Sequence, residues 1–144
     1  MTKNYDPNQI VQSFAGIPIL GYAKGTFVNV AFNADAFNLT VGSSGEGCRA
    51  KTNDRSMIVT FTLLQSTQTN DLLSAIHNVD LLSPNGDGVG PYLLKDLQGT
   101  TLYTAETMWI KKFADLSYSD EVDARVWTLE TDAGLANIGG NLSL

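Results

Sequence analysis

The chain has 144 residues, 43% of them hydrophobic and 17% charged, with a formal net charge of −6 at pH 7. This length fits a single domain over residues 1–144. Because average soluble domains are roughly 25% charged, the low charge content suggests that other protein covers part of the surface. An acidic chain is a poor ligand for nucleic acid or an anionic membrane surface, since both attract clustered Lys or Arg. No apolar run approaches the roughly 18 residues of a membrane-spanning helix.

Alternating apolar and polar residues predict strands along most of the chain. Turns at Ala15-Gly16 and Gln98-Gly99 predict two hairpins. The predicted strands cover residues 9–14, 17–20, 26–32, 37–41, 56–64, 92–97, 101–113 and 121–130. Residues 131–144 carry a weaker pattern. About seven or eight strands and a single helix predict a mainly β fold, a β-sandwich or barrel with one flanking α-helix.

The strand at 56–64 and the helix that follows it form the centre of the predicted fold. One apolar face of the strand is formed by Met57, Val59, Phe61 and Leu63. The helix is predicted over residues 70–82, where apolar residues recur at i, i+3, i+4 spacing: Leu72, Ala75, Ile76, Val79 and Leu82. We expect the stripe of Leu72, Ile76 and Val79 to pack on the outside of the sheet.

Residues 42–55 form a long polar segment before that strand. Three glycines within residues 42–47 predict a flexible loop, and the whole segment is longer than the roughly two to five residues of a hairpin turn. Charges of both signs follow one another along it, at Glu46, Arg49, Lys51, Asp54 and Arg55. Such a segment can reach a neighbouring subunit and pair with it, or it can remain a solvated loop.

Residues that carry enzyme chemistry are scarce and scattered. His77 is the only histidine and lies inside the predicted helix, so we interpret it as a structural residue. Cys48 is the only cysteine and lies beside Arg49. It is interpreted either as a small residue in a loop or as part of a contact between chains. Residues 85–88 lack the full spacing and the terminal Glu of a calcium loop. We therefore expect no catalytic, cofactor-binding or metal-binding residues and no enzymatic activity.

Short segments follow one another in a specific order over nearly the whole chain. They are Tyr5-Asp6-Pro7-Asn8, Gly25-Thr26-Phe27, Asp35-Ala36-Phe37, Val41-Gly42, Asn53-Asp54-Arg55-Ser56, Leu63-Leu64-Gln65, Asn70-Asp71-Leu72-Leu73-Ser74-Ala75, Gly88-Val89-Gly90-Pro91, Lys95-Asp96-Leu97, Trp109-Ile110 and Gly139-Gly140-Asn141. As an ordered set, they resemble the inner tail tube proteins of contractile-tailed bacteriophages. Residues 84–87 depart from that pattern as a longer insertion.

The resemblance implies a virion protein that forms hexameric rings, which stack into the tail tube. Its implied partners are further copies of itself, the tail sheath protein around the tube, the tape-measure protein inside it, and the baseplate and tail terminator proteins. DNA would pass through the lumen without specific binding, and we expect a neutral to acidic lumen with Asp120, Glu121 and Asp123 as candidates. The protein would be made and assembled in the host cytoplasm.

In similar tube proteins a long loop between strands contacts the adjacent ring. The resemblance therefore implies ring-stacking contacts by Glu46, Arg49, Lys51, Asp54 and Arg55. Two alternatives remain: the tube of a phage-tail-like bacteriocin or of a type VI secretion-like injection machine, and a monomeric β-sandwich binding module.

Overall fold

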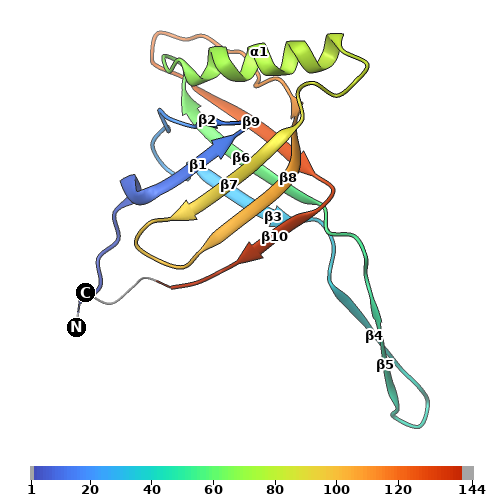
Figure 1. Cartoon of the computed structure of the whole chain (residues 1–144). Coiled ribbons are helices and arrows are strands. Elements are labelled where there is room, and N and C mark those ends of the chain that lie inside the picture. The colour runs from blue at the N-terminus through green and yellow to red at the C-terminus, as the bar shows by residue number, and fades with distance from the viewer. Residues whose placement is uncertain (1, 141–144) are drawn as a thin grey trace.

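The computed structural model describes residues 2–140 (Figure 1). They form a short 3-10 helix (Pro7–Gln9), the α-helix α1 (Thr69–Leu82) and ten strands. The strands are β1 (Ile10–Phe14), β2 (Ile17–Pro18), β3 (Val28–Phe32), β4 (Phe37–Val41), β5 (Gly47–Lys51), β6 (Met57–Leu64), β7 (Gly90–Asp96), β8 (Leu102–Lys112), β9 (Ala124–Thr131) and β10 (Gly134–Asn137). This mainly β architecture with one helix confirms the predicted fold class.

Eight strands form one antiparallel sheet in the order β2-β1-β7-β8-β9-β6-β3, with β10 paired to β8. The sheet curls into a barrel (Figure 1). Residues 19–23 cross from β1 to β6: the Ile19 N–H donates to the carbonyl of Gln12 at 2.9 Å, and the Ala23 N–H donates to that of Thr62 at 3.0 Å. This crossing joins the two sides of the barrel near the start of α1.

The barrel is filled by the inward faces of its strands. On β6, the predicted apolar face is confirmed, because Met57, Val59, Phe61 and Leu63 are all fully buried. The rest of the apolar core consists of Phe14, Ile19, Leu73, Tyr92, Leu94, Ala105, Met108, Ile110, Trp127 and Leu129. The long strand at the centre of the sequence is thus also the centre of the core.

One polar chain of hydrogen bonds runs through this core. The Tyr92 hydroxyl donates to Oε1 of Gln12, and Nε2 of Gln12 donates to the Tyr22 hydroxyl at 3.1 Å. Burial raises the pKa of the Tyr92 phenol above its ordinary value, and nearby Tyr22 raises it further. Burial also raises the pKa of Tyr22, against a smaller lowering by its bond to Gln12. Both phenols therefore stay neutral and satisfy Gln12, which is itself buried.

The sequence predicted that the helix packs on the outside of the sheet. The structure instead places α1 across one end of the barrel (Figure 1). Its inward face presents Leu73 and His77, with Ile76 partly buried beside them. Leu72 and Val79 are 46% and 51% exposed, so the predicted packing face is wrong for these two residues. Two adjacent stripes of this helix contain leucine, and periodicity alone does not tell which one meets the core.

Residues 42–55 are also organised differently from the prediction. Residues 47–51 form β5, which pairs with β4, so the expected loop is mostly the second half of a β-hairpin. The turn is closed by the Gly42 N–H, which donates to the carbonyl of Glu46 at 2.7 Å, and Gly45 has a left-handed φ of 88°. This hairpin, residues 37–51, projects away from the barrel and is called the arm below (Figure 1).

Three smaller points complete the description. β10 was not predicted, because Gly134–Asn137 has little apolar alternation. Asn141, which closes the last segment of the family resemblance, lies outside the described residues. Across residues 2–140, no helix has the length and apolar character needed to cross a membrane.

Candidate assembly surfaces

The arm has two chemically different faces. Residues that pair across an antiparallel hairpin share a face, and the register pairs Phe37 with Lys51, Leu39 with Arg49 and Val41 with Gly47. One face therefore combines three apolar residues with two basic ones, and we call it the apolar–basic face. The other face carries Asn38, Thr40, Cys48 and Ala50.

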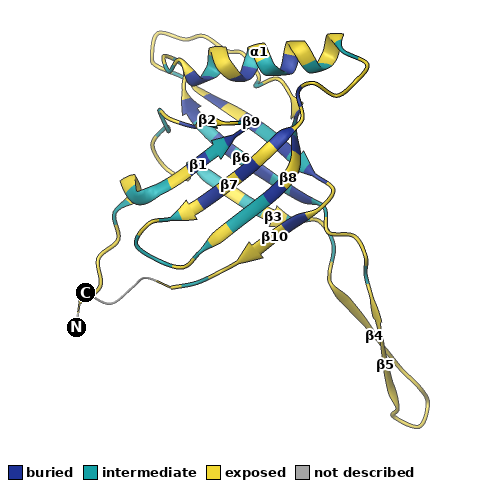
Figure 2. Ribbon diagram, viewed as in Figure 1, coloured by how far each residue is buried: buried dark blue, intermediate teal, exposed yellow. Residues whose placement is uncertain are grey.

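No element within residues 2–140 covers the apolar–basic face. All ten strand residues of the arm are exposed (Figure 2), and Leu39 is 71% exposed. The Arg49 guanidinium lies 4.1 Å from the centre of the Phe37 ring, which orders the two side chains on the same face. Neighbouring exposed apolar residues of this kind are typical of a surface that meets another protein.

The five predicted stacking residues do not form one cluster. Glu46 lies in the turn at the tip, Arg49 and Lys51 lie on β5, and Asp54 and Arg55 lie at the base of the arm. Arg49, Lys51 and Arg55 make no ion pair with any of the described residues 2–140, so their charges are available to a partner.

The base of the arm is held by local contacts. Asp54 accepts hydrogen bonds from the Ser56 hydroxyl at 2.6 Å and the Ser56 N–H at 2.9 Å, and both bonds lower the pKa of Asp54. Arg55 lies over the Phe32 ring at 4.9 Å, and its carbonyl accepts from the Gly134 N–H at 3.0 Å. Asp54 and Arg55 therefore have roles in fixing where the arm leaves the barrel.

A groove lies at the other end of the molecule, between α1 and the β8–β9 connection (residues 113–123). Its volume is about 390 Å³, and we call it the helix-end groove. Its lining includes Asn70, Asp71, Ser74, Leu116, Tyr118 and Trp127. Leu116 and Tyr118 are 69% and 76% exposed and give the groove an apolar rim. Its lining also contains one acidic residue, Asp71, and one basic residue, the buried Arg125. Sequence reasoning missed it, since residues 113–123 have no regular pattern.

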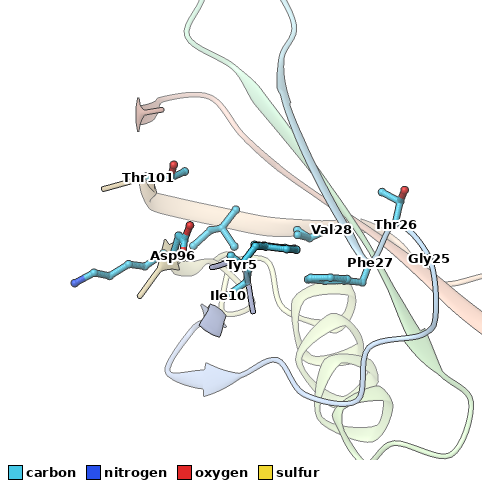
Figure 3. Close-up of a pocket in the computed structure, with 10 residues that line it drawn as sticks. Tyr5, Ile10, Gly25, Thr26, Phe27, Val28, Asp96 and Thr101 are labelled. Carbon is cyan, nitrogen blue, oxygen red and sulfur yellow. The ribbon is translucent and has the colours of Figure 1, made fainter. Parts of the chain in front are cut away.

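A second hollow, of about 400 Å³, lies where the curled sheet is not closed (Figure 3). Phe27 and Val28 line it from the β3 side, and Ile10 and Leu94 line it from β1 and β7, with Tyr5 between them. β3 is the last strand of the sheet, and its outer edge pairs with no strand among the described residues. An unpaired strand edge of this kind is a surface to which another chain can add a strand.

The candidate reactive residues are far from one another in the fold. His77 is buried on α1 with its ring 4.5 Å from that of Phe113, and Cys48 is exposed on the arm. Within residues 2–140, no group of three or more His, Cys, Asp or Glu side chains is placed to hold a metal ion. The prominent features of the surface are thus an unpartnered arm, a groove and an open strand edge.

The fold of this chain is similar to that of proteins in contractile injection systems. The chain matches a sheath/tube terminator of the extracellular contractile injection system PVC with a TM-score of 0.60 and 10% identity, over 95% of this chain and 99% of that one. It matches the anti-feeding prophage tube-terminating cap with a TM-score of 0.61 and 6% identity, over 95% and 93%. It also matches a chain of the PVC sheath–tube complex in the extended state, with a TM-score of 0.61 and 9% identity, over 93% of this chain and 91% of that one.

The sequence is also similar to a phage protein. Structural protein ORF10 of Pseudomonas phage KPP10 is 26% identical over 146 aligned residues, which cover 97% of this chain and 84% of that protein. No family model matches the chain. The resemblance to contractile-tail proteins is confirmed by these comparisons.

Proposed function

We propose that this protein is a subunit of the inner tube of a contractile phage tail, in which copies form hexameric rings that stack. The observation that carries the proposal is the chain-long match to a chain of the PVC sheath–tube complex, which covers 93% of this chain and 91% of that one. The similarity to a phage structural protein over 97% of the chain supports a place in a virion.

The surface is suited to self-assembly. The open edge of β3 is available for pairing with a strand of a neighbouring copy, which would extend the sheet around a ring. The arm leaves the barrel with all its strand residues exposed, which suits it to contact with the next ring. We assign the ring-stacking contacts to this region, with Glu46, Arg49 and Lys51 in direct contact and with Asp54 and Arg55 also facing the neighbour.

A role as a tube subunit implies several further partners. A sheath protein surrounds it, a tape-measure protein fills it during assembly, and baseplate and terminator proteins bind its ends. DNA passes through the lumen without specific binding, because an acidic chain does not retain phosphates. Assembly takes place in the host cytoplasm, and the role is structural, not enzymatic. Retention of short duplex DNA by purified tubes at low salt would contradict this part of the proposal.

A second candidate function is tube termination. Two of the structural neighbours described above are terminating proteins of injection systems, and one of them is matched over nearly its full length. A terminator forms a single ring that ends the tube, whereas a tube subunit continues to stack. The tube of a phage-tail-like bacteriocin or of a type VI secretion-like machine would stack in the same way. The genes beside the one that encodes this protein distinguish these machines from a phage, because only a phage has capsid genes there.

Negative-stain electron microscopy of the purified chain separates these functions. A tube subunit is expected to give rings at low concentration and stacked tubes at high concentration. A terminator gives rings that do not stack with one another. A monodisperse 15.5 kDa monomer at high concentration would contradict both functions and would favour a binding module.

A further inference from the structure

We propose that the arm of one copy docks, apolar–basic face inward, in the helix-end groove of the next copy. This inference rests on the proposed stacking function and names the receptor surface for the arm. The occupant of the groove is thus a second copy of this chain, and both halves of the contact are present on every subunit.

The positions of the two surfaces support head-to-tail contact. The arm leaves the barrel at the Met57 end of β6, and α1 begins just beyond its Leu64 end. β6 has eight residues, so its end residues are separated by about 23 Å at ~3.3 Å per residue. β9 runs antiparallel to β6 and pairs Ala124 with Leu64, so residues 113–123 lie at the α1 end as well. Figure 1 shows the arm pointing away from the end that α1 covers.

Two different surfaces at opposite ends of one subunit give a heterologous interface, in which each copy presents its arm to one neighbour and its groove to another. Such a contact repeats without closing and builds a stack. A symmetric contact between two arms would instead stop at a pair. The observed placement therefore favours the arm–groove pairing over an arm–arm pairing.

The apolar parts of the two surfaces are complementary. Phe37, Leu39 and Val41 form a short apolar row along one face of β4, and all three are exposed. Leu116 and Tyr118 form an exposed apolar rim beside α1. Joining the two sets would remove both from water, which is the main source of affinity at protein interfaces.

The charges are complementary too. Residues 37–51 carry +1, from Arg49 and Lys51 against Glu46, whereas the whole chain carries −6 and the remainder therefore −7. The connection 113–123 contains four acidic residues and no basic residue: Asp115, Asp120, Glu121 and Asp123. α1 adds Asp71 and Asp80 and has no Lys or Arg. The groove lining itself contains Asp71 and the buried Arg125, which lies over the Tyr118 ring, and Asp115 pairs with Lys112. The arm is thus a basic element on an acidic protein, and the segments that border the groove, α1 and residues 113–123, are acidic in sum. Opposite potentials of this kind fix orientation and speed association.

A pair of neighbouring substitutions tests which face of the arm makes the contact. Leu39→Asp places a charge on the apolar–basic face, and Thr40→Asp places the same charge one residue later on the opposite face. We expect Leu39→Asp to raise the critical concentration for tube formation on the order of tenfold or more, and Thr40→Asp to change it by less than about twofold. Equal effects of the two variants would overturn the docking orientation.

Disulfide trapping tests the receptor surface. In full-length protein with Cys48→Ser, Leu39→Cys is combined either with Ser74→Cys in the helix-end groove or with Lys95→Cys in the hollow beside β3. A disulfide requires Cα atoms within about 7 Å. Oxidised tubes should give a ladder of covalent multimers on non-reducing gels with Ser74→Cys and none with Lys95→Cys.

The outcomes separate the two proposals. Tubes that give no ladder, or a ladder with Lys95→Cys only, would overturn the arm–groove contact and leave the tube function standing. Wild-type protein that forms neither rings nor tubes would remove the tube function and the docking inference with it. The groove could instead hold a segment of the sheath protein. In that case the cysteine of Ser74→Cys would react with a maleimide until purified sheath is added, and the sheath would then protect it. Protection by the sheath without a ladder would also overturn the inference.

Discussion

The indole Nε1–H of Trp127 on β9 donates a 2.9 Å hydrogen bond to Oδ1 of Asn70 in the first turn of α1. The amide Nδ2 of Asn70 in turn donates to the carbonyl of Leu64, at the end of β6, at 3.0 Å. One side chain therefore joins the helix to two adjacent strands, and it does so in the floor of the helix-end groove.

Replacement of Asn70 by Ala should lower the free energy of unfolding by about 1–3 kcal/mol, because the buried indole N–H of Trp127 loses its acceptor. Asn78→Ala is the matched control, since Asn78 is exposed on the same helix. Urea denaturation of both variants below the assembly concentration measures the difference. Equal stability of the two would mean that the Asn70–Trp127 bond does not fix the helix.

The packing face of α1 can be tested with adjacent leucines. Leu73→Ala should cost ~2–5 kcal/mol, because Leu73 is fully buried in the core. Leu72→Ala should cost much less in the isolated subunit, since nearly half of that side chain is exposed. Thermal and urea unfolding of the two variants gives the comparison, and a larger loss for Leu72→Ala would place the helix in the orientation that the sequence predicted.

The Tyr92 phenol makes the fold sensitive to alkali. Its pKa is raised in the folded state by burial first and by Tyr22 second, so the unfolded chain loses this proton at lower pH. The stabilisation is therefore complete below the ordinary tyrosine pKa of about 10 and is lost as the pH rises above it. Tyr92→Phe should cost about 1–3 kcal/mol at pH 7, because Gln12 loses a hydrogen bond.

The same variant should show a shallower loss of stability with rising pH above about 10 than the wild-type protein. Urea midpoints measured from pH 7 to pH 11 give both slopes. Parallel curves for the two proteins would show that Tyr92 does not carry the alkaline sensitivity.

Reversal of charge on the arm should weaken stacking without unfolding the subunit. Arg49→Glu with Arg55→Glu reverses two positive charges that make no ion pair with any described residue of the same chain. Each exposed ion pair contributes only ~0–1 kcal/mol, but a ring repeats each contact around its axis. Circular dichroism should be unchanged, and tube length should fall most at low salt, where screening is weakest. Normal tubes at all salt concentrations would exclude these arginines from the contact.

The sequence correctly predicted the elements whose residue pattern follows from one local cause, such as one buried face or one tight turn. β6 alternates because one of its faces fills the barrel, and the turn at Ala15-Gly16 contains two residues with φ of 52° and 81° that suit a tight hairpin. The predicted range of the helix differs from the observed one by a single residue at its start. In these cases the residues of the element itself were sufficient to predict its structure.

The orientation of α1 and the shape of the arm required information that a single sequence lacks. Leu72 and Leu73 both continue an apolar stripe, and the end of the barrel decides which one is buried. Gly47–Lys51 shows no buried alternation, since β5 has no buried face in the monomer and all its residues are exposed. The helix-end groove combines α1 with residues 113–123, far apart along the chain, so only the fold brings them together.

The most direct test of head-to-tail stacking is a cryo-electron microscopy reconstruction of the assembled wild-type protein. It should show rings in which each arm reaches a subunit of the adjacent ring and places Leu39 against Leu116 and Tyr118, beside α1. An assembly in which the arms lie in solvent, or contact only subunits of their own ring, would contradict the account.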